Sequence, residues 1–148
     1  MHLQKKFVMK KWFLSQNGAI TLSVMAFLVY LGRVFLDWRY ESHLLGAEGS
    51  LQEFLYILMF LAFAGSWVWG TLAAKSGSRG GLLTCLILAL LLDVGFAAAT
   101  YFFWCPPASC PKFIPNLWQW NWAELILGLV ASISIGLQLT GKTSNRLL

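Results

Sequence analysis

Charged side chains are scarce in this sequence. Asp, Glu, Lys and Arg together make up 11% of its 148 residues, whereas hydrophobic residues make up 58%. An ordinary soluble domain carries about 25% charged residues, so the composition argues against a water-soluble globular fold. It also argues against disorder and nucleic-acid binding, because both need a far more polar and charged surface. We therefore expect a small integral membrane protein that contacts the lipid bilayer and binds no nucleic acid.

Signatures of catalysis and cofactor binding are also few. The patterns G-x-G-x-x-G, H-E-x-x-H and G-x-S-x-G do not occur. A metal site needs three or four ligands in suitable geometry, and His43, with scattered acids in its loop, is a weak candidate. We expect no metal and no cofactor, and the sequence favours a role other than catalysis.

Long apolar runs are what the sequence does contain. A membrane-spanning helix needs roughly 20 mostly apolar residues, and lipid favours helices because they satisfy their own backbone hydrogen bonds. Short connections between such helices predict one all-α domain over residues 1–148, an antiparallel bundle of four transmembrane helices. The predicted spans cover residues 18–36, 51–74, 82–104 and 122–139, after a basic interfacial segment 1–17 and with outer loops 37–50 and 105–121.

The basic residues are distributed unequally between the two predicted membrane sides. One side carries eight of them and no acid, and by the positive-inside rule that side is cytoplasmic. Both termini are therefore predicted to lie in the cytoplasm, with the chain in the inner membrane of a bacterium. The eight residues are Lys5, Lys6, Lys10, Lys11, Lys75, Arg79, Lys142 and Arg146.

Asp93 is the charged residue closest to the middle of a predicted span. The rise of an α-helix puts it about 16 Å from either end of the third span. Acids inside the membrane usually face the helix bundle and often serve ion or proton pathways. The alternative is an aspartate that is protonated or hydrogen-bonded and only fixes helix packing.

Arg33 is a candidate partner for Asp93 from the first span. Its α-carbon differs in depth from that of Asp93 by about 12 Å, so a direct ion pair requires a tilt or an offset. We favour the simpler interpretation, in which the long side chain extends to the outer membrane surface.

Glu53 and Glu124 could extend the same polar site at the outer end of the bundle. Each follows a capping residue, Ser50 or Asn121, by three positions, which is the capping-box pattern at a helix start. A carboxylate in the first turn is also stabilised by the helix dipole. Structural capping is therefore the favoured interpretation, and a functional cluster of these acids with Arg33 and Asp93 is the alternative.

Cys105 and Cys110 lie five residues apart in the second outer loop. In an oxidising compartment such a pair forms a disulfide, which closes a short loop and stabilises by about 2 kcal/mol on the entropy model. A redox-active pair is the alternative.

Small residues recur at four-residue spacing in the spans, and such stripes let helices approach closely in lipid. Packing inside the chain and contact with a partner helix both remain open. The stripes are Ala62, Ser66, Gly70 and Ala74 in the second span and Gly128, Ser132 and Gly136 in the fourth, while Ala89 and Ala97 flank Asp93 in the third.

Three functions follow as hypotheses. The first is an accessory or interaction subunit of a membrane complex, whose partner is another membrane protein or a second copy of this chain. The second is a small ion- or proton-coupled transporter that uses Asp93. The third is a membrane thiol redox protein that uses Cys105 and Cys110.

Overall fold

The computed structural model describes residues 11–45, 51–99 and 117–141, and every regular element in these ranges is a helix. Four stretches are long and apolar enough to cross a membrane: Gln16–Leu36, Ile57–Lys75, Arg79–Ala99 and Gln119–Leu139. For the described residues, the prediction of an all-helical fold with four helices long and apolar enough to span a membrane is confirmed. The elements are α2 Gln16–Leu45, α3 Leu51–Lys75, α4 Arg79–Leu88, the π-helix η1 Ala89–Gly95, α5 Phe96–Ala99 and α6 Leu117–Leu139.

Two helices extend further than the hydrophobic pattern predicts. α2 runs on to Leu45, although the sequence predicts a loop over 37–50, because no glycine or proline interrupts the chain between residues 37 and 45. α6 begins at Leu117, inside the predicted loop 105–121, shortly after Pro115, which disfavours helix in the residue before it. An apolar stretch therefore locates a span but not the ends of its helix.

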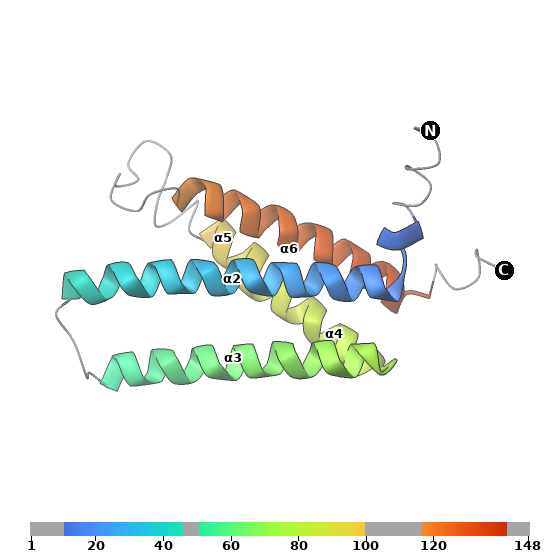
Figure 1. The fold of residues 1–148 in the computed structure, drawn as a ribbon, viewed down its shortest axis with the longest axis horizontal. Coiled ribbons are helices and arrows are strands. Elements are labelled where there is room, and N and C mark those ends of the chain that lie inside the picture. Colours follow the sequence, from blue (N-terminus) through green and yellow to red (C-terminus); the bar gives the residue numbers. More distant parts are fainter. Residues whose placement is uncertain (1–10, 46–50, 100–116, 142–148) are drawn as a thin grey trace.

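The third span, formed by α4, η1 and α5 in direct succession, crosses the molecule diagonally (Figure 1). It starts beside α3, passes behind α2 in this view, and ends beside α6. The contacts agree, because α4 packs against α3 whereas η1 and α5 pack against α6. α2 also packs against α6 and α3. The third span thus connects α3 and α6, which make few contacts with each other.

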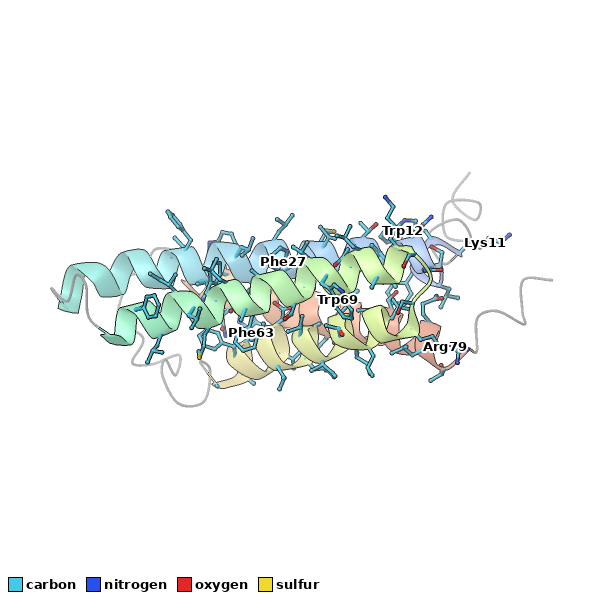
Figure 2. All side chains as sticks on the ribbon, turned by 90° about the horizontal axis from the view of Figure 1, so that it is seen from below. Lys11, Trp12, Phe27, Phe63, Trp69 and Arg79 are labelled. Atoms are coloured by element: carbon cyan, nitrogen blue, oxygen red, sulfur yellow. The ribbon has the colours of Figure 1, made fainter. Side chains whose placement is uncertain are left out.

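One end of the molecule holds the short α3–α4 turn together with the start of α2 and the end of α6 (Figure 1), and we name it the turn end. Gly77 makes the turn at a φ of 90°, which a residue with a side chain rarely adopts, and the Ser78 hydroxyl accepts a hydrogen bond from the Gly81 amide and caps α4. Figure 2 shows Lys11 and Arg79 at this same end.

Side chains also tie the three helix ends together at the turn end. Gln16 Nε2 donates to the carbonyl oxygen of Ala74 at 2.6 Å, and Ser134 Oγ donates to that of Phe13 at 2.8 Å. Gln138 Nε2 donates to the carbonyl of Leu14. These bonds satisfy carbonyls that a helix end or turn leaves without a helical partner.

Aromatic packing holds α2 against α3 near the middle of the molecule. Trp67 is fully buried, and its indole Nε1 donates a 2.8 Å hydrogen bond to Ser23 Oγ across the interface. Its ring lies 5.2 Å from the ring of Phe27 and 5.9 Å from that of Tyr30, centre to centre. A buried tryptophan needs such a partner for its N–H, and this pair fixes how the two helices face each other.

The small-residue stripe of α3 divides between two environments. Gly70 and Ala74 are buried against α4, where a Cβ on Gly81 would lie 2.5 Å from the Ala74 nitrogen. Ala62 and Ser66, by contrast, are exposed. Each four-residue step turns about 40° around a helix of 3.6 residues per turn, so the stripe drifts from the outside of the molecule to the α4 interface.

α3 is consequently the least covered of the four spans. Only 17% of its most apolar part is buried, against 33% to 39% for the other three. The third span leaves α3 after the turn end, so among the described elements only α2 follows α3 along its first half (Figure 1). Its uncovered face carries Ala62, Gly65, Ser66 and Trp69, all exposed.

The third span approaches α6 closely at Gly128. A Cβ placed there would lie 2.5 Å from the Cβ of Asp93, closer than real atoms come, and 3.3 Å from the backbone nitrogen of Val94. Ala89 and Ala97, on either side of Asp93, are almost completely buried as well. Small residues at this contact let the two helix backbones meet without intervening side chains.

We predict that Gly128→Ala destabilises the fold by about 1–3 kcal/mol, because the new methyl group forces η1 and α6 apart. Thermal unfolding in mild detergent measures the change. The matched control is Gly136→Ala in the same helix, where an added Cβ meets nothing within 4 Å and a better helix former replaces glycine. Equal melting temperatures for both variants would contradict the close contact at Gly128.

Candidate functional site

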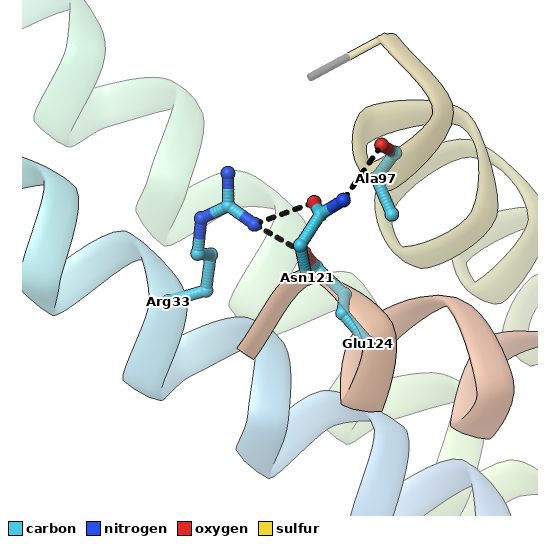
Figure 3. Close-up of polar contacts among 4 residues, drawn as sticks. All are labelled: Arg33, Ala97, Asn121 and Glu124. Carbon is cyan, nitrogen blue, oxygen red and sulfur yellow. Dashed lines mark hydrogen bonds and ion pairs between the residues drawn. The ribbon is translucent and has the colours of Figure 1, made fainter. Parts of the chain in front are cut away.

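Arg33 is buried in the interior of the molecule and pairs with α6. Its side chain is 2% exposed, and its Nη1 lies 3.1 Å from Glu124 Oε2, while the Glu124 side chain is fully buried (Figure 3). The preferred interpretation of Arg33, extension to the outer membrane surface, is therefore wrong. The acid that Arg33 binds is Glu124 of α6, which the sequence argument on depth did not consider as its partner.

Asn121 joins this ion pair to the third span. Its Oδ1 accepts a 2.9 Å hydrogen bond from Arg33 Nη1, and its Nδ2 donates a 3.2 Å bond to the carbonyl oxygen of Ala97. Figure 3 shows the asparagine standing between the guanidinium and α5. One side chain thereby links α2, α5 and α6 through hydrogen bonds.

The capping interpretation of Asn121 and Glu124 is wrong. Both residues lie inside α6, which begins at Leu117, so neither occupies a helix start. Glu53 lies near the start of α3, but its side chain and its capping partner Ser50 are outside the described residues. The sequence motif fits both interpretations because the same residues that cap helices also form buried hydrogen bonds.

Two ring contacts set the approach of α2 to its neighbours around Arg33. A Cβ on Gly32 would lie 2.8 Å from the Trp120 ring, so glycine there allows α2 to approach α6 beside Asn121. The Arg33 guanidinium carbon lies 5.4 Å from the centre of the Phe96 ring in α5, within the range of a cation–π contact. The cation is therefore held by an acid, an amide and an aromatic face.

Asp93 lies in the π-helix η1 and is fully buried. Neither of its carboxylate oxygens has a hydrogen-bond partner within the part of the chain that the structure describes. Buried polar groups are almost always hydrogen-bonded, so an aspartate in this state calls for an explanation. The π-helix, with i→i+5 bonds, is itself rare and occurs frequently at functional sites.

The register between η1 and α6 places Asp93 relative to the ion pair. Asp93 abuts Gly128, which lies one helical turn beyond Glu124 in α6, or about 6 Å along the axis. Ala97, one turn after Asp93, meets Asn121. Arg33, Asp93, Asn121 and Glu124 therefore form one buried group across three helices, which we name the polar cluster.

Sequence reasoning singled out Arg33, Asp93 and Glu124, and the structure brings all three into this group. It did not assign Asn121 to the site, and it missed the role of Ser132, whose buried hydroxyl has no partner among the described residues. A helical-face argument finds Ser132, because it follows Glu124 and Gly128 at four-residue spacing on α6.

Other candidate chemistry lies elsewhere. Cys105 and Cys110 are outside the described residues, and Cys85 is a buried free thiol whose sulfur lies 3.8 Å from Thr71 Oγ1. Within the described ranges no three His, Cys, Asp or Glu side chains come together as metal ligands.

One sequence pattern at the end of α6 can be interpreted from the structure around it. Residues 136–143 read G-x-x-x-x-G-K-T, the pattern of a phosphate-binding loop, which requires a strand before it and a helix after it. Here the pattern begins inside α6, which ends at Leu139. The match therefore carries no argument for nucleotide binding.

No protein-family model matches this chain, and neither a curated protein nor a solved structure matches it. Two physical features remain on which a function can be proposed. They are the polar cluster and the uncovered face of α3.

We predict that Arg33→Met destabilises the protein by about 3–5 kcal/mol, because it removes the cation from a buried carboxylate. Combining it with Glu124→Gln should restore most of this loss, since the double variant buries no unmatched charge. The free energies of unfolding of both single variants and the double variant give the coupling directly. Arg79→Gln, at an exposed position, is the control. Strictly additive effects would show that the ion pair contributes nothing.

Proposed function

We propose that this chain is a polytopic protein of a cytoplasmic membrane, with its four helices alternating in direction and both termini in the cytoplasm. The support is the separation of charge along the molecule. Lys11, Lys75 and Arg79 belong to the turn end, and the acids Asp93 and Glu124 are buried away from it. Lys and Arg accumulate at cytoplasmic ends of spans, so we assign the turn end to the cytoplasm.

Within that membrane we propose an accessory role, as the small subunit of a membrane complex or of a homo-oligomer. The observation that carries this proposal is the uncovered face of α3. Large apolar side chains such as leucine are well suited to contact with lipid, whereas small residues on a span are typical of helix–helix interfaces in membranes. On the uncovered face of α3 these small residues contact no neighbouring helix among the described residues, since an added Cβ on Gly65 meets nothing within 4 Å.

The buried and exposed halves of the small-residue stripe of α3 both support contact with another helix. Gly70 and Ala74 show what this pattern does when a helix is present, because α4 packs directly onto them. Ala62 and Ser66 continue the pattern, and together with Gly65 beside them they are exposed, with no helix among the described elements packed on them. A second transmembrane helix, from a partner or from another copy, fits this surface in the same way that α4 fits the buried half.

We predict that Gly65→Leu abolishes association while leaving the stability of the single chain unchanged. Leucine fills the space that a partner helix needs, yet it touches nothing within this chain. Purification in mild detergent, followed by native mass spectrometry, measures the bound partner or the oligomeric state. Gly136→Leu is the control, because its position is equally open but lies on α6. A wild-type chain that purifies as a lone monomer, or a Gly65→Leu chain that keeps its partner, would overturn the accessory role.

The second candidate function is proton- or ion-coupled transport, and the buried carboxyl of Asp93 favours it. Intramembrane acids mark ion and proton pathways in pumps and transporters. The packing alternative, a hydrogen-bonded aspartate that locks helices together, fits less well, because no bond joins the Asp93 carboxyl to another described residue. The redox hypothesis for Cys105 and Cys110 stays a prediction of the sequence.

We predict that Asp93→Asn reduces proton-coupled flux in proteoliposomes to the level of protein-free vesicles. Asparagine has nearly the same shape but cannot take up and release a proton. A pH-sensitive dye trapped in the vesicles measures the flux, and Arg79→Gln serves as the charged-residue control. Wild-type flux in the Asp93→Asn protein would end the transport proposal.

A further inference from the structure

The charges of the polar cluster do not balance if both acids are ionised. Arg33, Asp93 and Glu124 are the acidic and basic side chains that are buried among the described residues. The single guanidinium is engaged with Glu124 at 3.1 Å. A second carboxylate in the same interior would leave one uncompensated negative charge in lipid, which is strongly disfavoured. The neutral arrangement therefore has a proton on Asp93.

A proton held only for structure would be expected to serve a hydrogen bond. A protonated carboxyl is a donor through its O–H, and a helix-locking aspartate would donate to a neighbouring carbonyl or hydroxyl. Asp93 makes no such bond, and Ser132, on the same face of α6, has a hydroxyl that is also without a partner in the described ranges. The Asp93 carboxyl is buried, and no hydrogen bond to another described residue uses it for packing.

We propose that Asp93 is an intramembrane proton-binding site, about one turn of α6 from the Arg33–Glu124 ion pair, with Ser132 as the next polar group towards the turn end. Proton release breaks the carboxyl O–H bond, leaves the electron pair on Asp93, and passes the proton to water that reaches the site. The polar cluster then carries the negative charge that the proton had neutralised. Uptake reverses these changes.

The Arg33–Glu124 ion pair lies close to Asp93 along α6. Arg33 contacts Glu124 in α6 directly, and its guanidinium lies over the ring of Phe96, which follows Asp93 by three residues in the third span. Asp93 itself abuts Gly128, one turn from Glu124.

The other titratable groups of the packed helices face elsewhere. Tyr30 of α2 packs on Phe60 and Trp67 of α3, and Cys85 of α4 faces Thr71 of α3. Among the described residues, the other buried acidic or basic side chains are Glu124 of α6, one turn from the Asp93 contact at Gly128, and Arg33 of α2, which binds Glu124. The site is thus defined by one cation and two acids.

The test uses the small number of aspartates in the chain, Asp37 and Asp93. Asp37→Asn removes the one that lies beyond the predicted spans, so carboxyl-13C aspartate then labels Asp93 alone. The protein is placed in lipid vesicles, and solid-state NMR and infrared spectra of the labelled carboxyl are recorded between acidic and alkaline buffer. We expect a neutral carboxylic acid, with the high C=O stretching frequency of a group without a hydrogen bond, that converts reversibly to a carboxylate as the pH rises.

Two further variants sharpen the result. Arg33→Gln removes the buried cation of the polar cluster, so the neutral form of Asp93 should persist to higher pH, whereas Arg79→Gln at the turn end should leave the titration unchanged. A carboxyl that stays protonated at every pH, or that is ionised at every pH, would overturn the proposal.

This inference extends the transport candidate and rests on it for the biological role of the proton site. The spectra, however, detect the proton on Asp93 whether or not the protein carries a proton flux. A titrating Asp93 in a protein without proton flux would refute the transport function and leave the proton site standing. A carboxyl that never titrates would refute both. The accessory role is tested separately, through α3.

Discussion

The close packing of the third span against α6 is the contact on which the rest of this structure depends. Gly128 allows the π-helix to approach until the backbone of α6 meets Asp93. One turn away, the same approach lets Asn121 reach the carbonyl of Ala97 while it accepts from Arg33. In lipid there is little hydrophobic drive between helices, so small residues and polar bonds of this kind decide which helices associate.

Much of the fold follows from the sequence because the bilayer leaves so few solutions. Apolar length alone locates the four spans, since each must cover the hydrocarbon and bond its own backbone. The helix ends do not follow from this rule, because nothing in lipid thickness ends a helix once it reaches water. α2 therefore continues to Leu45 and α6 starts at Leu117, where the apolar pattern alone predicts loops.

The polar cluster shows a different limit. Charge scarcity picks out Arg33, Asp93 and Glu124 from the sequence, because an ionisable residue in a span needs a reason to be there. Which of these residues pair depends on how the helices are aligned with one another, and the sequence alone does not give that alignment. The capping pattern at Asn121 and Glu124 misleads for the same reason: moving the helix start by one turn changes a cap into a buried bond.

One geometric fact links both functional proposals. The third span crosses diagonally from α3 to α6 (Figure 1). The part of it that carries Asp93 therefore packs on α6 and does not cover α3. Bringing Asp93 to Gly128 leaves Ala62, Gly65 and Ser66 exposed, with no other described helix packed on them. In the proposed assembly, a partner helix on α3 would stabilise the hairpin that carries the third span, and through it the spacing between Asp93 and the Arg33–Glu124 pair. The proposed assembly at α3 and the proposed proton binding at Asp93 thus depend on the same helix crossing.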